Sequence, residues 1–151
     1  MAEINFFVEQ TRFALQNKTA VRNWLVNSAR KEKKSIEKLN YIFCTDEYLL
    51  SINKTYLNHA TLTDIITFST EGLGDLLMSN SNKNKLNGEI YISIDRVKEN
   101  AKIFNVKFTT ELHRVMIHGL MHLCGYGDKS AVKKKQMRGK EDYYLAQYSS
   151  K

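Results

Sequence analysis

Two histidines stand four residues apart in the stretch HGLMHLCGYGD, which covers residues 118–128. If the surrounding segment is a helix, His118 and His122 project from nearly the same side of it and can reach one cation. The apolar residues that would then face the core are Leu112, Met116, Leu120 and Leu123. The spacing therefore predicts two ligands of a metal site on an amphipathic helix.

A third ligand is needed, because a catalytic zinc site usually has three protein ligands and one water. Gly125 stands where the helix is expected to end with a left-handed residue, and Gly127 adds a second flexible position. The chain can therefore turn back sharply towards the histidines. Asp128 is the first side chain after this turn that can bind a metal.

Three other side chains compete with Asp128 for this role. His113 lies about 140° from His118 around a helix, and Cys124 lies about 160° from His122, so neither joins the pair easily. His59 lies far along the chain, and only the fold can bring it to the pair. At this point Asp128 is favoured and His59 stays open.

The residue after the first histidine distinguishes between kinds of metal chemistry. In the HExxH zinc proteases this residue is a glutamate that acts as general base, whereas here it is Gly119, which cannot accept a proton. Peptide hydrolysis by that route is therefore disfavoured. A bound metal can still lower the pKa of water to about 7 and polarise a carbonyl or phosphoryl oxygen.

The charge of the chain favours a polyanionic partner. Twenty-three Lys and Arg residues against sixteen Asp and Glu residues give a net charge of +7. Such an excess attracts nucleic acid. Much of it lies in residues 30–35 and 128–140, and each of these runs taken alone is better explained as the solvated face of a helix.

The elements that must position these residues are those of one domain, because 151 residues with 42% hydrophobic residues suffice for a single core. Residues 1–151 are therefore expected to form a single domain. Predicted strands cover residues 4–9, 38–45, 64–70 and 88–95. Predicted helices cover residues 18–33, 46–57, 96–105, 109–125 and 130–148. About four strands and five helices predict an α/β or α+β domain with a mixed sheet.

Capping residues and composition add detail to this outline. Thr19 and Thr45 are predicted to cap the first two helices. Residues 71–87 contain two glycines and the run SNSNKNK, so they are predicted to form an exposed, mobile loop.

Cysteine usage and hydropathy predict a cytoplasmic protein. Cys44 and Cys124 follow no CxxC spacing and are expected to be buried, reduced thiols. The first residues do not resemble a signal peptide. No stretch approaches the roughly 18 apolar residues of a membrane span, so no membrane partner is expected.

These motifs together resemble the YbeY-type bacterial endoribonucleases, also called rRNA maturation factors. The family signature HGxLHLxGYDH matches this chain at His118, Gly119, His122, Leu123, Gly125 and Tyr126. Residues 45–69, 88–101 and 139–145 are similar to the family's Thr-Asp segment, its Gly-Asp-Ile strand with the next helix, and its closing helix. The resemblance covers most of the chain from about residue 40 onward.

The resemblance implies a zinc-dependent, single-strand-specific endoribonuclease of the cytoplasm. Its expected role is in 16S rRNA 3′-end maturation and in ribosome quality control. One Zn2+ per chain is the implied cofactor, and rRNA or other single-stranded RNA is the implied substrate. The small ribosomal subunit or its proteins are the implied partners, and DNA is not.

Two positions depart from the family pattern. Asp128 stands where the family has a third histidine, and zinc also accepts a carboxylate oxygen, so the predicted metal ligands are His118, His122 and Asp128. Leu57 stands where the family carries an arginine that is thought to hold the scissile phosphate, and leucine makes no charged contact. The candidates for that contact are Lys54, His59 and Arg114, each of which also has the character of an ordinary surface charge.

Further candidates come from the other similar segments. Thr63 and Asp64 match the family's Thr-Asp pair, and they begin a strand, so a catalytic role and a structural cap are equally supported. Arg96 and Lys98 follow the central strand and are candidate RNA contacts, although solvent exposure explains them slightly better.

Two alternative functions remain. A ribosome-assembly factor would bind RNA through its basic helices, with a structural metal and weak or no nuclease activity. A metallohydrolase that acts on peptides or small molecules has the weakest support, because Gly119 lacks the usual base.

Overall fold

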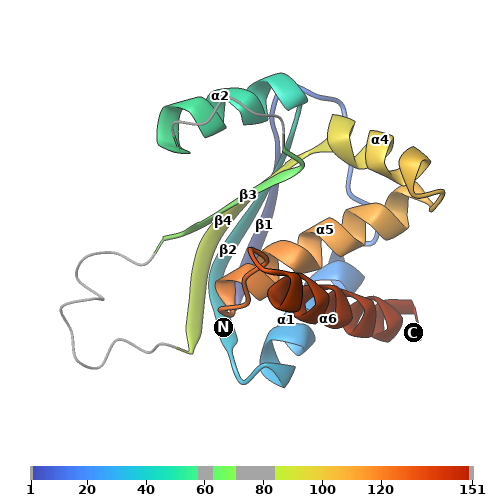
Figure 1. Ribbon diagram of the computed structural model, residues 1–151. Coiled ribbons are helices and arrows are strands. Elements are labelled where there is room, and N and C mark those ends of the chain that lie inside the picture. The colour runs from blue at the N-terminus through green and yellow to red at the C-terminus, as the bar shows by residue number, and fades with distance from the viewer. Residues whose placement is uncertain (1, 58–62, 71–83, 150–151) are drawn as a thin grey trace.

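The computed structural model describes residues 2–57, 63–70 and 84–149, without the side chains of Tyr56, Leu57 and Ser149. Its strands and helices are shown in Figure 1. The strands are β1 (Glu3–Val8), β2 (Ser35–Cys44), β3 (Ile65–Ser69) and β4 (Lys85–Ser93). The helices are α1 (Lys18–Lys31), α2 (Asp46–Leu57), α4 (Ile94–Ile103), α5 (Phe108–Leu123) and α6 (Ala131–Ser149). His59 and most of the predicted loop, residues 71–83, lie outside the described residues.

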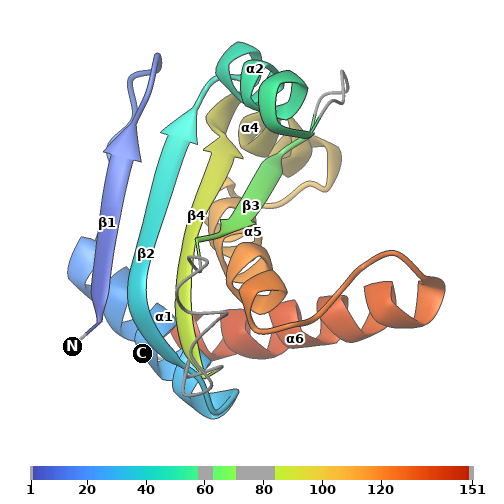
Figure 2. The same ribbon diagram turned by 90° about the vertical axis from the view of Figure 1, so that its left-hand side faces the viewer.

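The four strands form one mixed sheet in the order β1-β2-β4-β3. β1 and β4 both run parallel to β2, whereas β3 runs antiparallel to β4. Figure 2 shows the four strands side by side, with β1 and β3 at the two edges. The α/β class and the mixed sheet predicted from the sequence are confirmed.

Helices cover both faces of the sheet. The helices α1, α4, α5 and α6 lie on one face, and α2 lies across the other (Figures 1 and 2). On β4, Ile90 and Ile92 are fully buried in the larger core together with Met116 and Leu120 of α5. Tyr91, between these two isoleucines, packs in a smaller cluster under α2. The alternation predicted for this strand is therefore confirmed, as is the inward-facing side of α5.

Some boundaries and one cap differ from prediction. The N-cap of α1 is Asn17, in the left-handed conformation (φ 56°) without a side-chain cap bond, so the prediction of Thr19 was wrong. The Asn17 carbonyl takes the role by accepting the Val21 amide at 3.0 Å. The predicted cap at Thr45 is confirmed, since its Oγ1 accepts the Tyr48 amide at 3.0 Å.

Strand β4 begins at Lys85, inside the segment predicted to be loop. Lys85 to Asn87 pair with β2, starting at the register Ser35↔Lys85. Leu86 is 5% exposed and belongs to the larger core, and the backbone of this strand end forms its hydrogen bonds across the ladder. The polar residues on both sides of Leu86 therefore hid the start of the strand.

Both cysteines are free thiols, with Cys44 buried and Cys124 half-buried. Burial raises the pKa of each thiol to about 12, so neither is a reactive thiolate at neutral pH. Within the described ranges, no helix combines the length and the apolar character that a membrane span requires.

Candidate metal centre

Helix α5 carries the two histidines and lies very close to the sheet at the residue between them. A Cβ atom added to Gly119 would stand 2.9 Å from Cδ1 of Ile90 and 3.0 Å from Cδ1 of Ile65. Glycine therefore permits the close approach of α5 to β3 and β4. This packing explains Gly119 without any role in proton transfer.

The turn after α5 reverses the chain at Gly125 as predicted, whereas Gly127, the second glycine of that prediction, has no positive φ. Gly125 has a φ of 108°, which favours glycine. Its amide donates to the His122 carbonyl at 3.0 Å, and the Tyr126 amide donates to the Met121 carbonyl at 3.0 Å. These bonds close the end of the helix and direct the following residues back along it.

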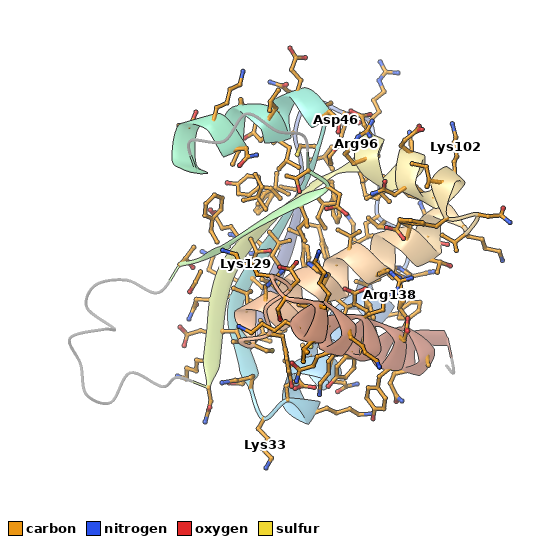
Figure 3. The ribbon with its side chains drawn as sticks, viewed as in Figure 1. Lys33, Asp46, Arg96, Lys102, Lys129 and Arg138 are labelled. Atoms are coloured by element: carbon orange, nitrogen blue, oxygen red, sulfur yellow. The ribbon has the colours of Figure 1, made fainter. Side chains whose placement is uncertain are left out.

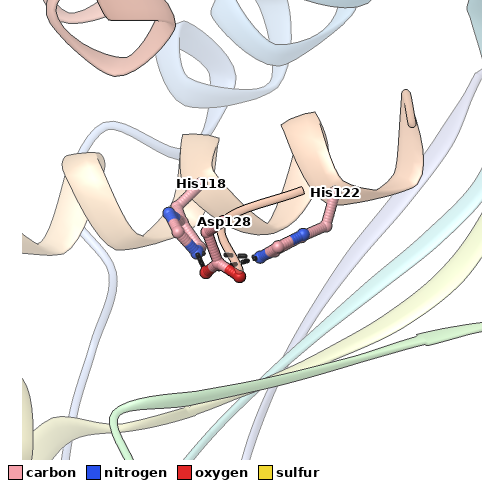
Figure 4. Close-up of side chains that lie close together, drawn as sticks. All are labelled: His118, His122 and Asp128. Atoms are coloured by element: carbon pink, nitrogen blue, oxygen red, sulfur yellow. Dashed lines mark hydrogen bonds and ion pairs between the residues drawn. The ribbon is translucent and has the colours of Figure 1, made fainter. Parts of the chain in front are cut away.

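His118, His122 and Asp128 come together on the open side of α5 (Figure 4). The two histidine Nε2 atoms are 2.9 Å apart. Oδ2 of Asp128 lies 3.4 Å from Nε2 of His118 and 3.3 Å from Nε2 of His122. Ligands on a tetrahedral metal at about 2.0–2.2 Å stand about 3.4 Å from one another, so three atoms at these separations fit one ion. The cluster can hold a metal ion.

Both imidazole rings are oriented by an acceptor at Nδ1. Nδ1 of His118 lies 2.6 Å from Oε2 of Glu141, and Nδ1 of His122 lies 2.9 Å from the Tyr126 carbonyl. A ring that donates from Nδ1 keeps a lone pair at Nε2, which is the form that binds a metal. In both rings the Nε2 atom faces Asp128.

Glu141 is 5% exposed and joins α6 to α5. Its second oxygen accepts from Nη1 of Arg114 at 2.9 Å, and Arg114 also donates to Asp142 at 2.8 Å. Glu141 was not among the residues predicted for the site. Its only signal in the sequence is its place in GKEDYYL, one of the segments similar to the family.

The negative charges around His118 favour a cation at this position. Burial alone would lower the pKa of His118, but the hydrogen bond and charge of Glu141, with the charges of Asp128 and Asp64, raise it. Negative charge that retains a proton on an imidazole also attracts a metal ion in its place.

A second carboxylate fixes the turn that carries Asp128. Glu32, at the end of α1, accepts from the Tyr126 hydroxyl at 2.6 Å and from Nζ of Lys140 at 2.9 Å. The Tyr144 hydroxyl also donates to it. Helices α1 and α6 therefore both hold Tyr126, whose carbonyl orients His122. Nothing in the spacing of the sequence indicated this role for Glu32.

The cluster of His118, His122 and Asp128 opens into a cleft of about 1030 Å³, which is lined by residues of β3, α5 and α6 and of the end of α4. Two further acids line it, Asp64 and Glu111. Burial raises the pKa of both carboxyls, and the charge of Asp64 raises that of Glu111 further. Each is therefore a group that holds a proton more readily than an ordinary carboxylate.

The structure brings some of the predicted residues to this cleft and not others. Thr63, Asp64 and Arg114 line it. The residues Lys54 and Lys98 are exposed on α2 and α4, outside its lining.

Arg96 is also absent from the lining, because its guanidinium pairs with Asp46 at 3.0 Å where α2 and α4 begin (Figure 3). His59 and the side chain of Leu57 lie outside the described residues.

The rival ligand on α5 is engaged elsewhere. The His113 ring packs at a tilt against two aromatic rings, with its centroid 5.6 Å from that of Trp24 and 4.5 Å from that of Tyr148, and burial lowers its pKa. Cys124 is not part of the group that can hold a metal. This geometry is consistent with the prediction from helical angles that neither His113 nor Cys124 joins the histidine pair easily.

An α/β domain with two histidines and a carboxylate at a cleft defines a candidate metal-binding protein, and comparison with known proteins narrows the class. A family model described as Endoribonuclease YbeY matches residues 3–149. A Cytophaga hutchinsonii protein named Endoribonuclease YbeY is 48% identical over 143 residues, 95% of this chain and 94% of the relative. A Flavobacterium johnsoniae protein of the same name is 47% identical over 146 residues, 96% of each chain.

A solved structure shares the fold of this chain. The solution structure of TM1509 from Thermotoga maritima matches with a TM-score of 0.64 and 25% sequence identity, over 96% of this chain and 88% of that one. The chain belongs to the YbeY endoribonuclease family.

Proposed function

We propose that this protein is a zinc-dependent endoribonuclease that cuts single-stranded RNA in 16S rRNA 3′-end maturation and ribosome quality control. The proposed zinc ligands are His118, His122 and Asp128, one ion per chain. The proposed setting is the cytoplasm, with the small ribosomal subunit or its proteins as partners. Family membership supports the reaction class, and the site supports the metal.

One observation carries the proposal. Two Nε2 atoms and one carboxylate oxygen converge, and each imidazole is oriented through Nδ1 by an acceptor from another segment. A histidine pair without such support is often an ordinary surface feature. Here a buried glutamate and a backbone carbonyl impose the metal-binding tautomer before any ion arrives.

The chemistry divides between the ion and the protein. When bound, a zinc ion lowers the pKa of water and polarises a phosphoryl oxygen. Asp64 and Glu111, with raised pKa values in the same cleft, are suited to hold or deliver a proton at the leaving oxygen. Arg138 and Lys129 are exposed cations on the cleft lining and are suited to hold phosphates of the chain.

A ribosome-assembly factor is the second candidate, and one observation favours it. Leu57 stands at the position where the resemblance to the family implies an arginine that holds the scissile phosphate. Arg114 lines the cleft but is held by Glu141 and Asp142, so it is not a free replacement. In that case the metal would be structural, and RNA would bind without being cut.

A cleavage assay separates the two functions. Metal-loaded protein is incubated with labelled single-stranded RNA, beside His118→Ala purified in parallel and the surface control Glu99→Ala. The nuclease predicts cleavage by the parent and by Glu99→Ala, and loss in His118→Ala. RNA binding without cleavage by the parent would favour the assembly factor. Equal cleavage by all three proteins would indicate a contaminating nuclease and would remove the support for this site.

A further inference from the structure

The end of α4 presents a large apolar side chain at the rim of the cleft. Phe104 is 56% exposed and lines the cleft that also contains His118 and Arg138. Its neighbours Ile103 and Val106 are 65% and 42% exposed, but neither is part of the lining. Exposing so much apolar area so close together is unfavourable in water, and such patches usually have a binding role.

Backbone hydrogen bonds define the turn that carries this side chain. The Phe104 amide donates to the Asn100 carbonyl at 2.9 Å, and the Val106 amide donates to the Ala101 carbonyl at 2.9 Å. Asn105 between them is left-handed, with a φ of 55°. This is the hydrogen-bonded turn that commonly ends helices, so the ring is attached to a defined support.

The surroundings of Phe104 match the chemistry of a polynucleotide. Asn100, one turn earlier on α4, also lines the cleft and offers an amide. Arg138 and Lys129 contribute exposed cations to the lining from α6 and from the segment before it, whereas Lys102 on α4 points away from the cleft (Figure 3). Sites for single strands combine cations that hold the phosphates with aromatic rings on which bases stack.

We propose that Phe104 is a stacking platform for an unpaired base of the RNA that enters this cleft, and that it contributes to selection of single strands. The inference rests on the proposed function, since it assumes that RNA is the substrate. A base within a duplex is already stacked and cannot offer its face to Phe104. RNA is favoured over a protein partner because the ring shares its cleft with the metal cluster and with cations.

Binding measurements on matched variants test the proposal. Fluorescence anisotropy is recorded for a labelled phosphorothioate RNA, as a single strand and annealed to its complement, against the full-length metal-loaded protein. Phe104→Ala removes the ring, Phe104→Tyr keeps a stacking face, and Ile103→Ala removes a neighbouring exposed side chain outside the lining. Both positions are exposed, so all three variants should fold, and circular dichroism checks this.

We expect Phe104→Ala to weaken single-strand binding by about 5- to 150-fold, the usual range for one lost stack. Duplex binding should change little, and Phe104→Tyr and Ile103→Ala should bind like the parent. The slope of log binding constant against log salt concentration should stay the same in Phe104→Ala. In Arg138→Ala this slope should become smaller by about one unit, because one phosphate contact is lost.

Single-strand binding by Phe104→Ala at the parent's affinity would overturn the stacking role alone. Equal losses in Phe104→Ala and Ile103→Ala would also overturn it, and would indicate a general apolar surface. If the parent bound no single-stranded RNA at all, the proposed function would fail and this inference with it.

Discussion

Nδ1 of His118 lies 2.6 Å from Oε2 of Glu141, a carboxylate on α6 that is 5% exposed. This contact fixes the ring of one candidate metal ligand from a different helix. It also makes Nε2 the free atom, which faces His122 and Asp128. Three segments, α5, the turn after it and α6, therefore determine the geometry of the cluster.

Replacing Glu141 should weaken metal binding although it is not a ligand. In Glu141→Gln the acceptor that orients His118 loses its charge, and loss of such a partner usually lowers metal affinity about 10- to 100-fold. Competition with a chromophoric chelator measures the affinity. Asp142→Asn is the matched control, because Asp142 pairs with the same Arg114 but is 59% exposed and makes no contact with His118. Equal affinities in the two variants would contradict the role given to Glu141.

Gly119 should be required for packing. In Gly119→Ala the new methyl group would press on Ile90 and Ile65 at a cost of about 1–3 kcal/mol, and helix propensity would offset about 0.5–1 kcal/mol of it, so the free energy of unfolding should fall by up to about 2.5 kcal/mol. Gly139→Ala, inside α6 with open space at its Cβ, should instead gain about 0.5–1 kcal/mol from helix propensity. Urea unfolding curves of the two variants and the parent give both values. A Gly119→Ala protein as stable as Gly139→Ala would show that α5 does not approach the sheet this closely.

Glu32 should make the stability of the protein depend on pH. Burial alone would raise its pKa, but hydrogen bonds from Tyr126, Tyr144 and Lys140 lower it below the ordinary value of 4.5. A lowered pKa in the folded state stabilises the protein above the unfolded value, and this stability is lost as pH falls through the folded value. Glu32→Gln should therefore cost about 1–3 kcal/mol at neutral pH and progressively less below about pH 4.

The measurement for Glu32 is urea unfolding of parent and variant across this pH range. Glu37→Gln is the control, because the pKa of Glu37 is also lowered, by Asn87 and Lys85, but its side chain is 51% exposed. Solvent screens such a surface pair, so it contributes little to stability, and Glu37→Gln should have nearly the same unfolding free energy as the parent at each pH. If the difference in unfolding free energy between the parent and Glu32→Gln did not become smaller at low pH, the charged form of Glu32 would not be the stabilising one.

Local spacing predicted the part of the site that lies on one helix and its turn. His118 and His122 share a face because of helical geometry, and Gly125 allows the reversal that brings Asp128 to them. The alternation of β4 and the inward side of α5 are properties of the same kind, because each follows from a period of two or of about 3.6 residues.

The supporting residues could not be predicted in this way. Glu141 and Glu32 reach the site from α6 and α1, and only the packing of these helices on α5 brings them there. The left-handed N-cap at Asn17 and the start of β4 at Lys85 were missed for a related reason. The Asn17 carbonyl accepts the hydrogen bond at the start of α1, and β2 pairs with the backbone at the start of β4. Neither interaction has a signal in the local sequence.

The central claim is that His118, His122 and Asp128 bind one metal ion together. Elemental analysis of purified protein after equilibration with zinc, with its affinity from chelator competition, tests it most directly. The account predicts about one zinc per chain in the parent, a large loss in Asp128→Ala, and recovery in Asp128→His, because imidazole is an equally good zinc ligand. A folded parent without metal, or full metal content in Asp128→Ala, would contradict it.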